Sequence, residues 1–517
     1  MTEHIKTLIA GQWRDASGPQ YTTEYPADAS TVATLNAATA DDVDEAVQAA
    51  QAARQKPNWA GLKVNERAAI LHRIAAGIRA RFEELAQLQR MDNGKPITET
   101  RGLVASAANT FQYFAAVCET FEDTVTPQRG DYLSMSLHEP LGVVGAITPW
   151  NSPIASEAQK MAPALAAGCA MVFKPAEITP RMAIELARIA EAAGVPPGII
   201  SVLPGKGALV GDALVRHPLV KRIAFTGGTS VGLGIAKLAA EKLMPVSLEL
   251  GGKSPTIVCA DADLDHAVAG VLYGIFSSSG ESCIAGSRAF VHASVYGEFK
   301  RRVVAGARAL RVGDPALEAT QMGPLVSGGH RAGIERYVQM GLDEGGKLLT
   351  GGARPKDDGR DDGSGDGGSG KRGGSDAGSG GLYGKGYFYL PTVFEGLGND
   401  ARMCREEIFG PVLALLPWTD EADLIAQCND NDYGLASGIW TRDYKTALRL
   451  GRALDTGTVW INTYKVFSIS TPFGGTKQSG MGREKGKASM AEYMAQKSYY
   501  WGLNESPMPW AGLEKTA

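Results

Sequence analysis

Apolar positions near the start of the chain follow a helical period. Between residues 41 and 55, the apolar residues Val43, Ala46, Val47 and Ala50 recur at the three- and four-residue spacing of an amphipathic helix. Two aspartates at the beginning of this segment suit the positive end of a helix dipole. We therefore expect helices to dominate the start of the chain.

The pattern changes at Gly142, where short apolar runs begin to alternate with helix-like segments. The apolar runs are residues 142–148, 170–174, 199–203, 221–225 and 246–250, and the helix-like segments are residues 154–167, 180–193 and 231–243. Strands that alternate with helices in this way form a parallel sheet with crossover helices. This α/β, doubly wound architecture binds its ligands at the carboxyl ends of the strands.

A chain of 517 residues is too long for one compact core, so we expect two or three domains. A second α/β region is predicted from about residue 251 to residue 475, with strands at 288–292, 412–417 and 458–462. Residues 357–381 contain almost only Gly, Ser, Asp, Lys and Arg. Because such a segment cannot bury apolar surface, it is predicted to be a mobile surface loop. A calcium-binding repeat is disfavoured, since no nonapeptide period is present.

Composition and charge exclude several classes of protein. The 52 basic and 56 acidic residues give a net charge of -4, so the chain offers no overall basic field for nucleic acid. The first residues lack an apolar signal core, and later apolar runs are interrupted before they reach membrane-spanning length. We therefore predict a cytoplasmic protein with no membrane partner. The six cysteines have no paired spacing and no metal-binding signature occurs, so neither a disulfide framework nor a metal site is predicted.

Cys283 is the strongest candidate for chemistry. It follows a run of serine and glycine residues, whose small size lets backbone amides approach a substrate oxygen. A cysteine needs a lowered pKa or a nearby base to attack a carbonyl carbon as the thiolate. Glu249, at the end of a predicted strand, is the candidate base. The other cysteines are predicted to be buried apolar residues: Cys118, Cys169, Cys259, Cys404 and Cys428.

Asn151 follows the strand predicted to end at Thr148, and its amide is expected at the mouth of the sheet. Asparagine here is commonly a turn-forming residue. A thiolate that adds to a carbonyl creates an oxyanion, which requires neutral hydrogen-bond donors. The presence of Cys283 favours an oxyanion-binding role for Asn151 over a turn-forming one. The two donors would then be the Asn151 amide and the Cys283 backbone N–H.

Residues 225–232 form a glycine-rich connection between a predicted strand and helix, where backbone amides and a helix N-terminus can meet a phosphate. The spacing is neither GxGxxG nor a Walker motif, which disfavours nucleotide hydrolysis; a purely structural turn is the alternative. Lys174 and Glu177 follow another strand, where a carboxylate can accept hydrogen bonds from both ribose hydroxyls, although a surface ion pair is also possible. Glu177 would repel a 2′-phosphate, which favours NAD over NADP.

Seven motifs occur in one order along nearly the whole chain. They are Pro-Trp-Asn at 149–151, Phe-Lys-Pro-Ala-Glu at 173–177, Phe-Thr-Gly-Gly-Thr at 225–229, Glu-Leu-Gly-Gly-Lys at 249–253, the Cys283 segment, Glu-Glu-Ile-Phe-Gly-Pro at 406–411 and Pro-Phe-Gly-Gly at 472–475. Together they resemble the NAD(P)-dependent aldehyde dehydrogenase superfamily. The separation of 34 residues between Glu249 and Cys283 is also similar to that of the family.

The resemblance implies a division of the chain and an assembly. Residues 1–119 and 141–250 would form a Rossmann-like NAD-binding domain, and residues 251–475 an α/β catalytic domain. Residues 120–140 and 486–503 would form a small β oligomerisation arm that joins subunits into a homodimer or a homotetramer.

The resemblance also implies roles for individual residues. Cys283 would be the nucleophile, Glu249 the general base and Asn151 an oxyanion donor, while Lys160 and Glu484 match positions that help to relay protons. The residues that would bind the cofactor are Thr148, Trp150, Lys174, Glu177, Gly207, Gly228, Val231, Leu250, Glu407 and Phe409.

Two positions depart from the family pattern. Gly228 stands where many relatives have a serine that contacts phosphate, so backbone contacts must suffice. Glu281 replaces the commoner glutamine two residues before the nucleophile. If its carboxylate faces the thiol, like-charge repulsion raises the pKa of Cys283; if it points outward, it does not.

The positions that would line the substrate pocket are Ser152, Ser156, Lys465, Phe467 and Phe473. Hydroxyl groups, an aromatic residue and a cation favour a polar aldehyde, a semialdehyde or a cyclic hemiacetal; the alternative for Lys465 is a solvated surface charge. The expected reaction is oxidation of the aldehyde to a carboxylate through a thiohemiacetal and a thioester.

Alternatives to this reaction are acyl transfer to coenzyme A, a cysteine hydrolase, and a non-catalytic binding or structural relative of the fold. Glu249 argues against coenzyme A, because relatives that use it generally lack this carboxylate. None of the seven histidines lies in a turn motif that resembles a Cys/His pair, which disfavours the hydrolase. A non-catalytic relative would have lost the nucleophile or the base, and both are present.

Overall fold

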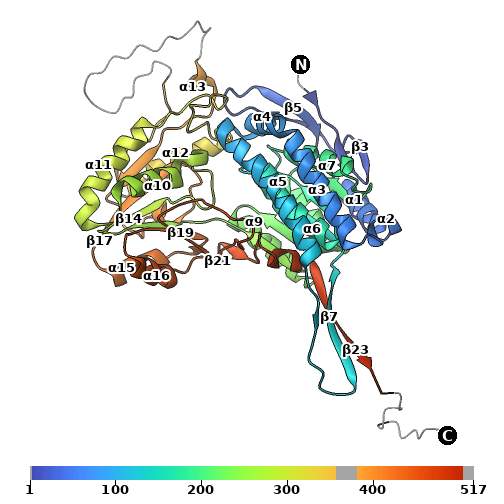
Figure 1. Ribbon diagram of the computed structural model, residues 1–517. Coiled ribbons are helices and arrows are strands. Elements are labelled where there is room, and N and C mark those ends of the chain that lie inside the picture. Colours follow the sequence, from blue (N-terminus) through green and yellow to red (C-terminus); the bar gives the residue numbers. More distant parts are fainter. Residues whose placement is uncertain (1–2, 357–380, 505–509, 511–517) are drawn as a thin grey trace, which may run out of the picture.

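The structure is a computed structural model that describes residues 3–356, 381–504 and 510. The loop predicted at residues 357–381 lies outside the described residues except for Gly381. The described chain forms two lobes and a narrow arm that projects away from them (Figure 1).

The chain begins with five short strands, so the expectation of a helical start is wrong for residues 3–36. The strands are β1 (Glu3–His4), β2 (Thr7–Ile9), β3 (Gln12–Arg14), β4 (Gln20–Glu24) and β5 (Thr31–Asn36). β5 pairs with β1 in parallel and with β4 in antiparallel orientation. These strands are short and rich in threonine on both faces, so their two-residue period is a weak signal.

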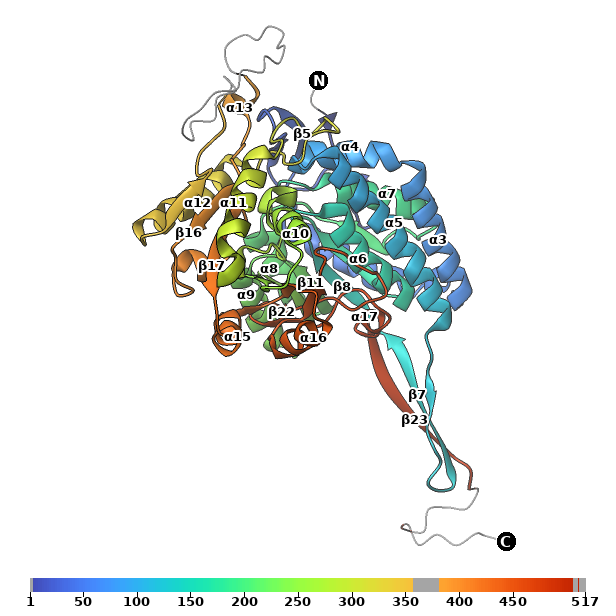
Figure 2. The ribbon, with the colours of Figure 1, turned by 60° about the vertical axis from the view of Figure 1, so that its left-hand side comes forward.

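Helices dominate the chain only after this strand region. They are α1 (Ala40–Ala53), α2 (Pro57–Ala60), α3 (Val64–Ala80), α4 (Phe82–Asn93) and α5 (Ile97–Thr120). The predicted helix at 41–55 is α1, which begins at a capping box in which the side chains of Thr39 and Asp42 each accept the other's backbone N–H. Helices α3, α4 and α5 lie together on one side of the first lobe (Figure 2). The apolar faces of the five helices join one core that contains residues from Ile5 to Leu250 together with Met490 and Tyr493.

A six-stranded sheet forms the centre of the first lobe, in the order β10–β9–β8–β11–β12–β22. Its strands are β8 (Val143–Ile147), β9 (Ala170–Lys174), β10 (Ile200–Val202), β11 (Val220–Thr226), β12 (Val246–Glu249) and β22 (Gly480–Met481). All neighbours are parallel except β12 and β22. The five strands predicted from the apolar runs are therefore confirmed to within two residues.

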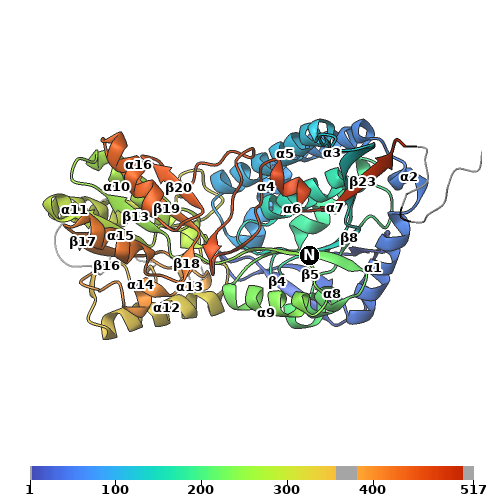
Figure 3. The same cartoon turned by 90° about the horizontal axis from the view of Figure 1, so that it is seen from below.

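Helices cover both faces of this sheet (Figure 3). α6 (Pro153–Ala167) and α7 (Arg181–Ala192) lie on one face, and α8 (Asp212–Arg216), which continues a π-helical turn at Gly207–Gly211, lies with α9 (Thr229–Ala240) on the other. The predicted doubly wound α/β fold is confirmed. The strand order reverses direction at β8, which pairs with β9 on one side and β11 on the other. Ligands of such sheets bind at this switch point, at the carboxyl edge.

The second lobe contains a seven-stranded sheet in the order β15–β16–β17–β14–β13–β19–β20. Its strands are β13 (Pro255–Val258), β14 (Arg288–His292), β15 (Lys347–Thr350), β16 (Thr392–Glu395), β17 (Val412–Trp418), β19 (Ala436–Trp440) and β20 (Thr458–Ile461). The three strands predicted in this region are β14, β17 and β20. Only the edge strand β15 is antiparallel to its neighbour.

Helices and short elements complete the second lobe. The helices are α10 (Leu264–Phe276), α11 (Ala293–Ala309), α12 (Gly328–Asp343), α13 (Leu382–Lys385), α14 (Arg402–Arg405), α15 (Glu421–Asn429) and α16 (Tyr444–Ala453), with a 3-10 turn, η2, at Ser277–Gly280. The short strands β18 (Tyr433–Gly434) and β21 (Thr476–Lys477) pair with each other. The sheet separates two apolar cores, because α10 and α11 pack on one face and α12 and α15 on the other.

The arm is a three-stranded ribbon of residues from two distant parts of the sequence. β7 (Tyr132–Pro140) pairs along its whole length with β23 (Met494–Gly502), which follows the short helix α17 (Ala488–Ala491), and β6 (Thr124–Val125) adds a third strand. Nearly all side chains of β23 are exposed. Each lobe has its own sheet, so we propose that the boundary between the two large domains lies near residue 250. We propose that the arm forms a third structural unit.

No helix among the described residues combines the length and the apolar character that a membrane span requires.

Candidate active site

The sheet of the first lobe brings three predicted site residues to one edge. Asn151 follows β8, Lys174 ends β9, and Glu249 ends β12. The carboxyl ends of parallel strands share an edge, so these side chains are positioned by the sheet itself. This edge faces the loops of the second lobe that carry Cys283 and Glu407.

Cys283 lies between η2 and β14 and is half-buried, whereas the other five cysteines are buried, as predicted. The turn before it has an unusual backbone, because Ser278 and Ser279 have φ values of 58° and 54°. Both carboxylate oxygens of Glu99 hold this turn, accepting hydrogen bonds from the backbone N–H and the hydroxyl of Ser278 at 2.8 Å each. Glu99 therefore fixes the start of the loop that presents the thiol.

A close backbone approach fixes the other side of the loop. A Cβ atom on Gly252 would overlap the carbonyl oxygen of Cys283, so only glycine fits at this position. The N–H of Gly252 donates to the Glu407 carboxylate at 3.0 Å. The residues after Glu249 thus position the nucleophile loop through their own backbone.

Asn151 contacts the same loop. Its side-chain amide donates to the carbonyl oxygen of Glu281 at 3.0 Å, two residues before Cys283. Because an amide nitrogen has two hydrogens, this bond orients the group and leaves one hydrogen for another acceptor. The structure therefore brings the proposed oxyanion donor to the nucleophile.

The surroundings of Cys283 keep its thiol protonated. Burial, and after it the Glu407 and Glu249 carboxylates, raise the pKa of Cys283 to about 12, while the Lys465 ammonium acts in the opposite direction. The half-buried Cys283 packs against an apolar cluster that includes Ile284, Trp460 and Tyr464. The thiolate needs a base or added positive charge to form at neutral pH.

Glu249 is buried, and neither of its carboxylate oxygens has a hydrogen-bond partner. Burial raises the pKa of Glu249 well above its ordinary value, and the Glu484 carboxylate raises it further, while Lys160 lowers it. A carboxylate with a raised pKa accepts a proton more readily than an ordinary carboxylate, which suits a general base.

Lys160 and Glu484 form a buried ion pair next to Glu249. The Lys160 ammonium donates to the Glu484 carboxylate and, at 2.6 Å, to the hydroxyl of Thr226 at the end of β11. The structure therefore brings the five predicted catalytic residues together around one edge of the sheet.

The predicted cofactor residues extend from this site along the sheet edge. The hydroxyl of Thr148 is buried without a partner, and Lys174 is buried near Glu177, so burial lowers the pKa of Lys174 while the carboxylate raises it. Gly228 caps α9 and is exposed, with open space where a Cβ would lie. Gly207 and Val231 are also exposed, whereas Leu250 is buried against Gly232.

An aromatic group lies at the nicotinamide end of this predicted cofactor set. The ring of Trp150 makes edge contacts with the rings of Phe409 and His330, each at 5.2 Å between centroids. Phe409 has a left-handed backbone, with φ of 57°, and its carbonyl oxygen lies 2.8 Å from His330 Nε2. Burial raises the pKa of Glu407 to about 7.

The predicted substrate residues fall into two groups. The hydroxyls of Ser152 and Ser156 are 2.9 Å apart at the start of α6. Phe467 and Phe473 make an edge contact at 5.4 Å, and Phe473 packs against the apolar cluster that also contacts Cys283. Lys465 is half-buried and donates to the Ser277 hydroxyl at 2.8 Å, so it is not the solvated surface charge of the alternative interpretation.

Glu281 points neither toward the thiol nor toward solvent. Its buried carboxylate accepts the N–H of Val326 at 2.8 Å and lies 3.7 Å from His330 Nε2. Burial raises the pKa of Glu281 to about 8, while the Lys95 ammonium lowers it. The carboxylates that raise the pKa of Cys283 are Glu407 and Glu249, and Glu281 is not among them. The repulsion considered for Glu281 therefore does not occur.

Sequence reasoning did not find four residues that contact this site. They are Lys95, Thr226, His330 and Lys485. Lys485 directly follows Glu484, yet nothing in the sequence distinguishes it from a surface lysine. His330 is the N3 residue of α12, and only the tertiary structure places its ring against Trp150.

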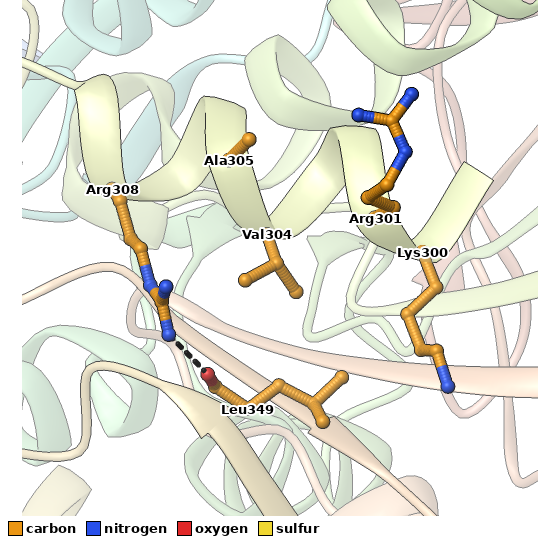
Figure 4. A pocket seen from close by; sticks show the side chains of 6 residues that line it. All are labelled: Lys300, Arg301, Val304, Ala305, Arg308 and Leu349. Carbon is orange, nitrogen blue, oxygen red and sulfur yellow. Dashed lines mark hydrogen bonds between the residues drawn. The ribbon is translucent and has the colours of Figure 1, made fainter. Parts of the chain in front are cut away.

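A pocket of about 350 Å³ lies elsewhere, between α11 and β15, and contains none of these residues (Figure 4). Its lining includes Lys300, Arg308 and Leu349, and Arg308 donates to the carbonyl oxygen of Leu349 at 3.1 Å. No cluster of potential metal ligands occurs among the residues that the structure describes.

Residues 13–365 and 368–499 match the aldehyde dehydrogenase family, and the chain belongs to this family. A Bacillus subtilis (strain 168) protein named DhaS is 40% identical over 515 residues, which cover 98% of this chain and 99% of that one. The betaine aldehyde dehydrogenase of the same strain is 38% identical over 97% of this chain and 98% of its own length. A solved NAD+ complex of an aldehyde dehydrogenase from Bacillus cereus has a TM-score of 0.90 at 37% identity and covers 97% of each chain.

Proposed function

We propose that this protein oxidises an aldehyde to a carboxylate with NAD, through a covalent intermediate on Cys283. The observation that carries the proposal is the convergence of three groups at one sheet edge. These are the half-buried thiol of Cys283, the buried carboxyl of Glu249 without a hydrogen-bond partner, and the Asn151 amide bonded to the nucleophile loop.

The residues of the sheet edge fit a dinucleotide. The first turn of α9 has no side-chain cap and begins at the exposed Gly228, so its N–H groups are available to a pyrophosphate. Lys174 and Glu177 would hold the adenosine ribose, and Glu407 and Phe409 the nicotinamide end. Bound NAD supplies the hydride acceptor for the oxidation step. The NAD+ complex of the Bacillus cereus relative supports this cofactor.

In the proposed reaction the Cys283 thiol first loses its proton to solvent. The thiolate sulfur then bonds to the carbonyl carbon, and the oxyanion accepts hydrogen bonds from the Asn151 amide and the Cys283 N–H. Loss of a hydride from the thiohemiacetal carbon leaves a thioester. Glu249 then takes a proton from the water that attacks the thioester, which releases the carboxylic acid and regenerates the thiol. The Lys160–Glu484 pair lies where it can pass the proton of Glu249 onward.

The proposed substrate is a polar aldehyde, a semialdehyde or a cyclic hemiacetal, because hydroxyl groups and the half-buried Lys465 are near the nucleophile. We further propose a cytoplasmic homodimer or homotetramer assembled through the exposed arm of β7 and β23. Transfer of the acyl group to coenzyme A is the alternative to hydrolysis, and identification of the product as an acid or a thioester decides between them.

The test is the substitution Cys283→Ser, assayed by NADH formation from NAD and a panel of aldehydes. We expect turnover to fall by about a thousandfold or more, because the hydroxyl is a far weaker nucleophile. Binding of NAD, measured by calorimetry, should persist. Cys118→Ala, which changes a buried cysteine of α5, is the matched control and should retain turnover. Full activity of Cys283→Ser would reject the proposal.

A further inference from the structure

Two lysines lie near the nucleophile: Lys465 on a loop of the second lobe, and Lys485 on the segment between β22 and α17. Only Lys465 was predicted. Lys485 is buried, and its ammonium lies 3.7 Å from the ring centroid of Phe467 and 5.3 Å from that of Phe473. Phe473 packs against the apolar cluster that also contacts Cys283. The aromatic rings therefore connect the Lys485 ammonium to the surroundings of the thiol.

Lys465 contacts the turn that leads to the same thiol. Its ammonium donates to the hydroxyl of Ser277 at 2.8 Å, and Ser277 begins the turn that leads to Cys283. The positive charge of Lys465 lowers the pKa of Cys283, as expected for an ammonium group bonded to the turn that precedes the thiol.

Neither lysine has a carboxylate partner among the described residues. The acidic groups that face them are otherwise occupied: Glu99 holds Ser278 with both oxygens, and Glu484 is paired with Lys160. Burial raises the pKa of Glu249 and so disfavours its charged form. Lys95 faces Lys465 with a like charge.

The partners of these ammonium groups are uncharged, namely aromatic rings for Lys485 and the Ser277 hydroxyl for Lys465, so each charge loses hydration without gaining an anion. Burial accordingly lowers the pKa of Lys465 and that of Lys485 to about 8 each. Both residues also have a left-handed backbone, with φ of 56° and 60°, a conformation that non-glycine residues rarely adopt. Backbone strain of this kind is concentrated at functional sites, where ligand binding offsets its cost.

The start of α6 also provides polar groups near the site. Ser152 and Ser156 share a hydrogen bond at the start of α6, and the same helix reaches Glu484, the neighbour of Lys485, through Lys160. Helix α6 also packs against α17, which begins three residues after Lys485. The two lysines and the serine pair therefore lie in one region around the thiol.

We propose that the substrate is an aldehyde with a carboxylate at its other end, and that this carboxylate pairs with Lys485 and Lys465 while its carbonyl meets Cys283. This inference rests on the proposed function. It also separates the protein from its betaine aldehyde dehydrogenase relative, because the quaternary ammonium group of betaine aldehyde would be repelled by both lysines.

The first experiment compares charged and neutral substrates of equal length. The probes are 4-oxobutanoate and 6-oxohexanoate, their methyl esters, and betaine aldehyde, each with NAD. Since hydrogen bonds to charged groups change affinity by roughly ten- to a hundredfold, kcat/KM should favour at least one acid over its ester by that factor. Betaine aldehyde should be the poorest substrate. An equal or higher kcat/KM for both esters would overturn the inference while leaving aldehyde oxidation intact.

The second experiment assigns the preference to the two lysines. Lys485→Met and Lys465→Met should each lower the ratio of kcat/KM for the preferred acid to that for its ester by about tenfold. Lys485→Arg keeps the charge and should restore most of the preference. Lys445→Met, on the exposed surface of α16, is the matched control and should change neither value. An unchanged ratio of acid to ester in both Met variants would overturn the assignment.

A binding measurement separates this inference from the proposed function. Cys283→Ala cannot form the covalent intermediate, yet it should bind adipate, the product-like dicarboxylate, about tenfold more tightly than dimethyl adipate, which has no carboxylate. Adipate binding that is lost in the Cys283→Ala, Lys485→Met double variant supports the carboxylate site even if catalysis fails. Equal binding of both compounds counts against the site. Absence of NADH formation from every aldehyde would refute the proposed function itself.

Discussion

The two sides of the active site are built in different ways. On the first lobe, Lys174 and Glu249 end strands whose backbones are hydrogen-bonded to neighbours over their whole length. On the second lobe, Cys283, Phe409 and Lys465 lie on loops, and the latter two have φ values of 57° and 56°.

This difference corresponds to what each side has to do. A sheet edge fixes groups at constant spacing, which suits a cofactor and the base that acts beside it. Loops can change sequence without disturbing a sheet, which suits contact with a particular substrate. The loops still need fixed points, and Gly252 and Glu99 provide them for the nucleophile.

The largest effect is expected on the sheet side, from Glu249→Gln. Without a base, the thioester should form but hydrolyse slowly, so kcat should fall by about 10²- to 10⁴-fold. A rapid-mixing experiment should still show a burst of NADH close to one per active site. Glu241→Gln, on the exposed end of α9, is the control. Loss of the burst would assign Glu249 to the first step and not to hydrolysis.

On the loop side, the protonation state of Cys283 predicts a strong pH dependence of alkylation. Because its pKa is raised to about 12, the thiolate fraction should rise tenfold per pH unit, or roughly a hundredfold from pH 7 to pH 9. The rate of modification by iodoacetamide, followed by mass spectrometry of the protein without cofactor, measures this. A rate that levels off below about pH 8 would show that the loop lowers the pKa instead.

The junction of the two sides is Gly252. In Gly252→Ala the new methyl group would overlap the Cys283 carbonyl oxygen, so the loop must shift. We expect kcat/KM to fall by about tenfold or more and the free energy of unfolding to fall by about 1–3 kcal/mol. Gly297→Ala, in α11 with no atoms near the added methyl, should leave activity unchanged and slightly raise stability. Normal activity of Gly252→Ala would show that the loop tolerates movement.

The smallest effect is expected from Glu281→Gln, which lies behind the loop. Because burial raises the pKa of Glu281 to about 8, the folded protein binds this proton more tightly than the unfolded chain. That stabilisation is present at low pH and is lost as the pH rises toward 8. Glu281→Gln should reduce the loss of thermal stability between pH 5 and pH 8, measured as a smaller fall of Tm over that range. Parallel melting curves for variant and wild type would contradict this environment.

The sequence predicted more of the first lobe than of the second. Uninterrupted apolar runs and helical periods located β8, β9, β11 and β12, because strands buried on both faces have a strong and local signal. The strands before Asn36 were missed, since short half-exposed strands with threonine on both faces carry little periodicity.

The sequence by itself determined the fold class, and it predicted Cys283, Glu249 and Asn151 as nucleophile, base and oxyanion donor, because small residues and strand ends mark them locally. Only the tertiary structure decided that Glu281 turns away from the thiol and that Lys485 approaches it. Those outcomes depend on contacts with Val326, Phe467 and Phe473, which belong to other loops. The charge environment of a side chain is set by the elements that pack around it, and local sequence patterns do not contain that information.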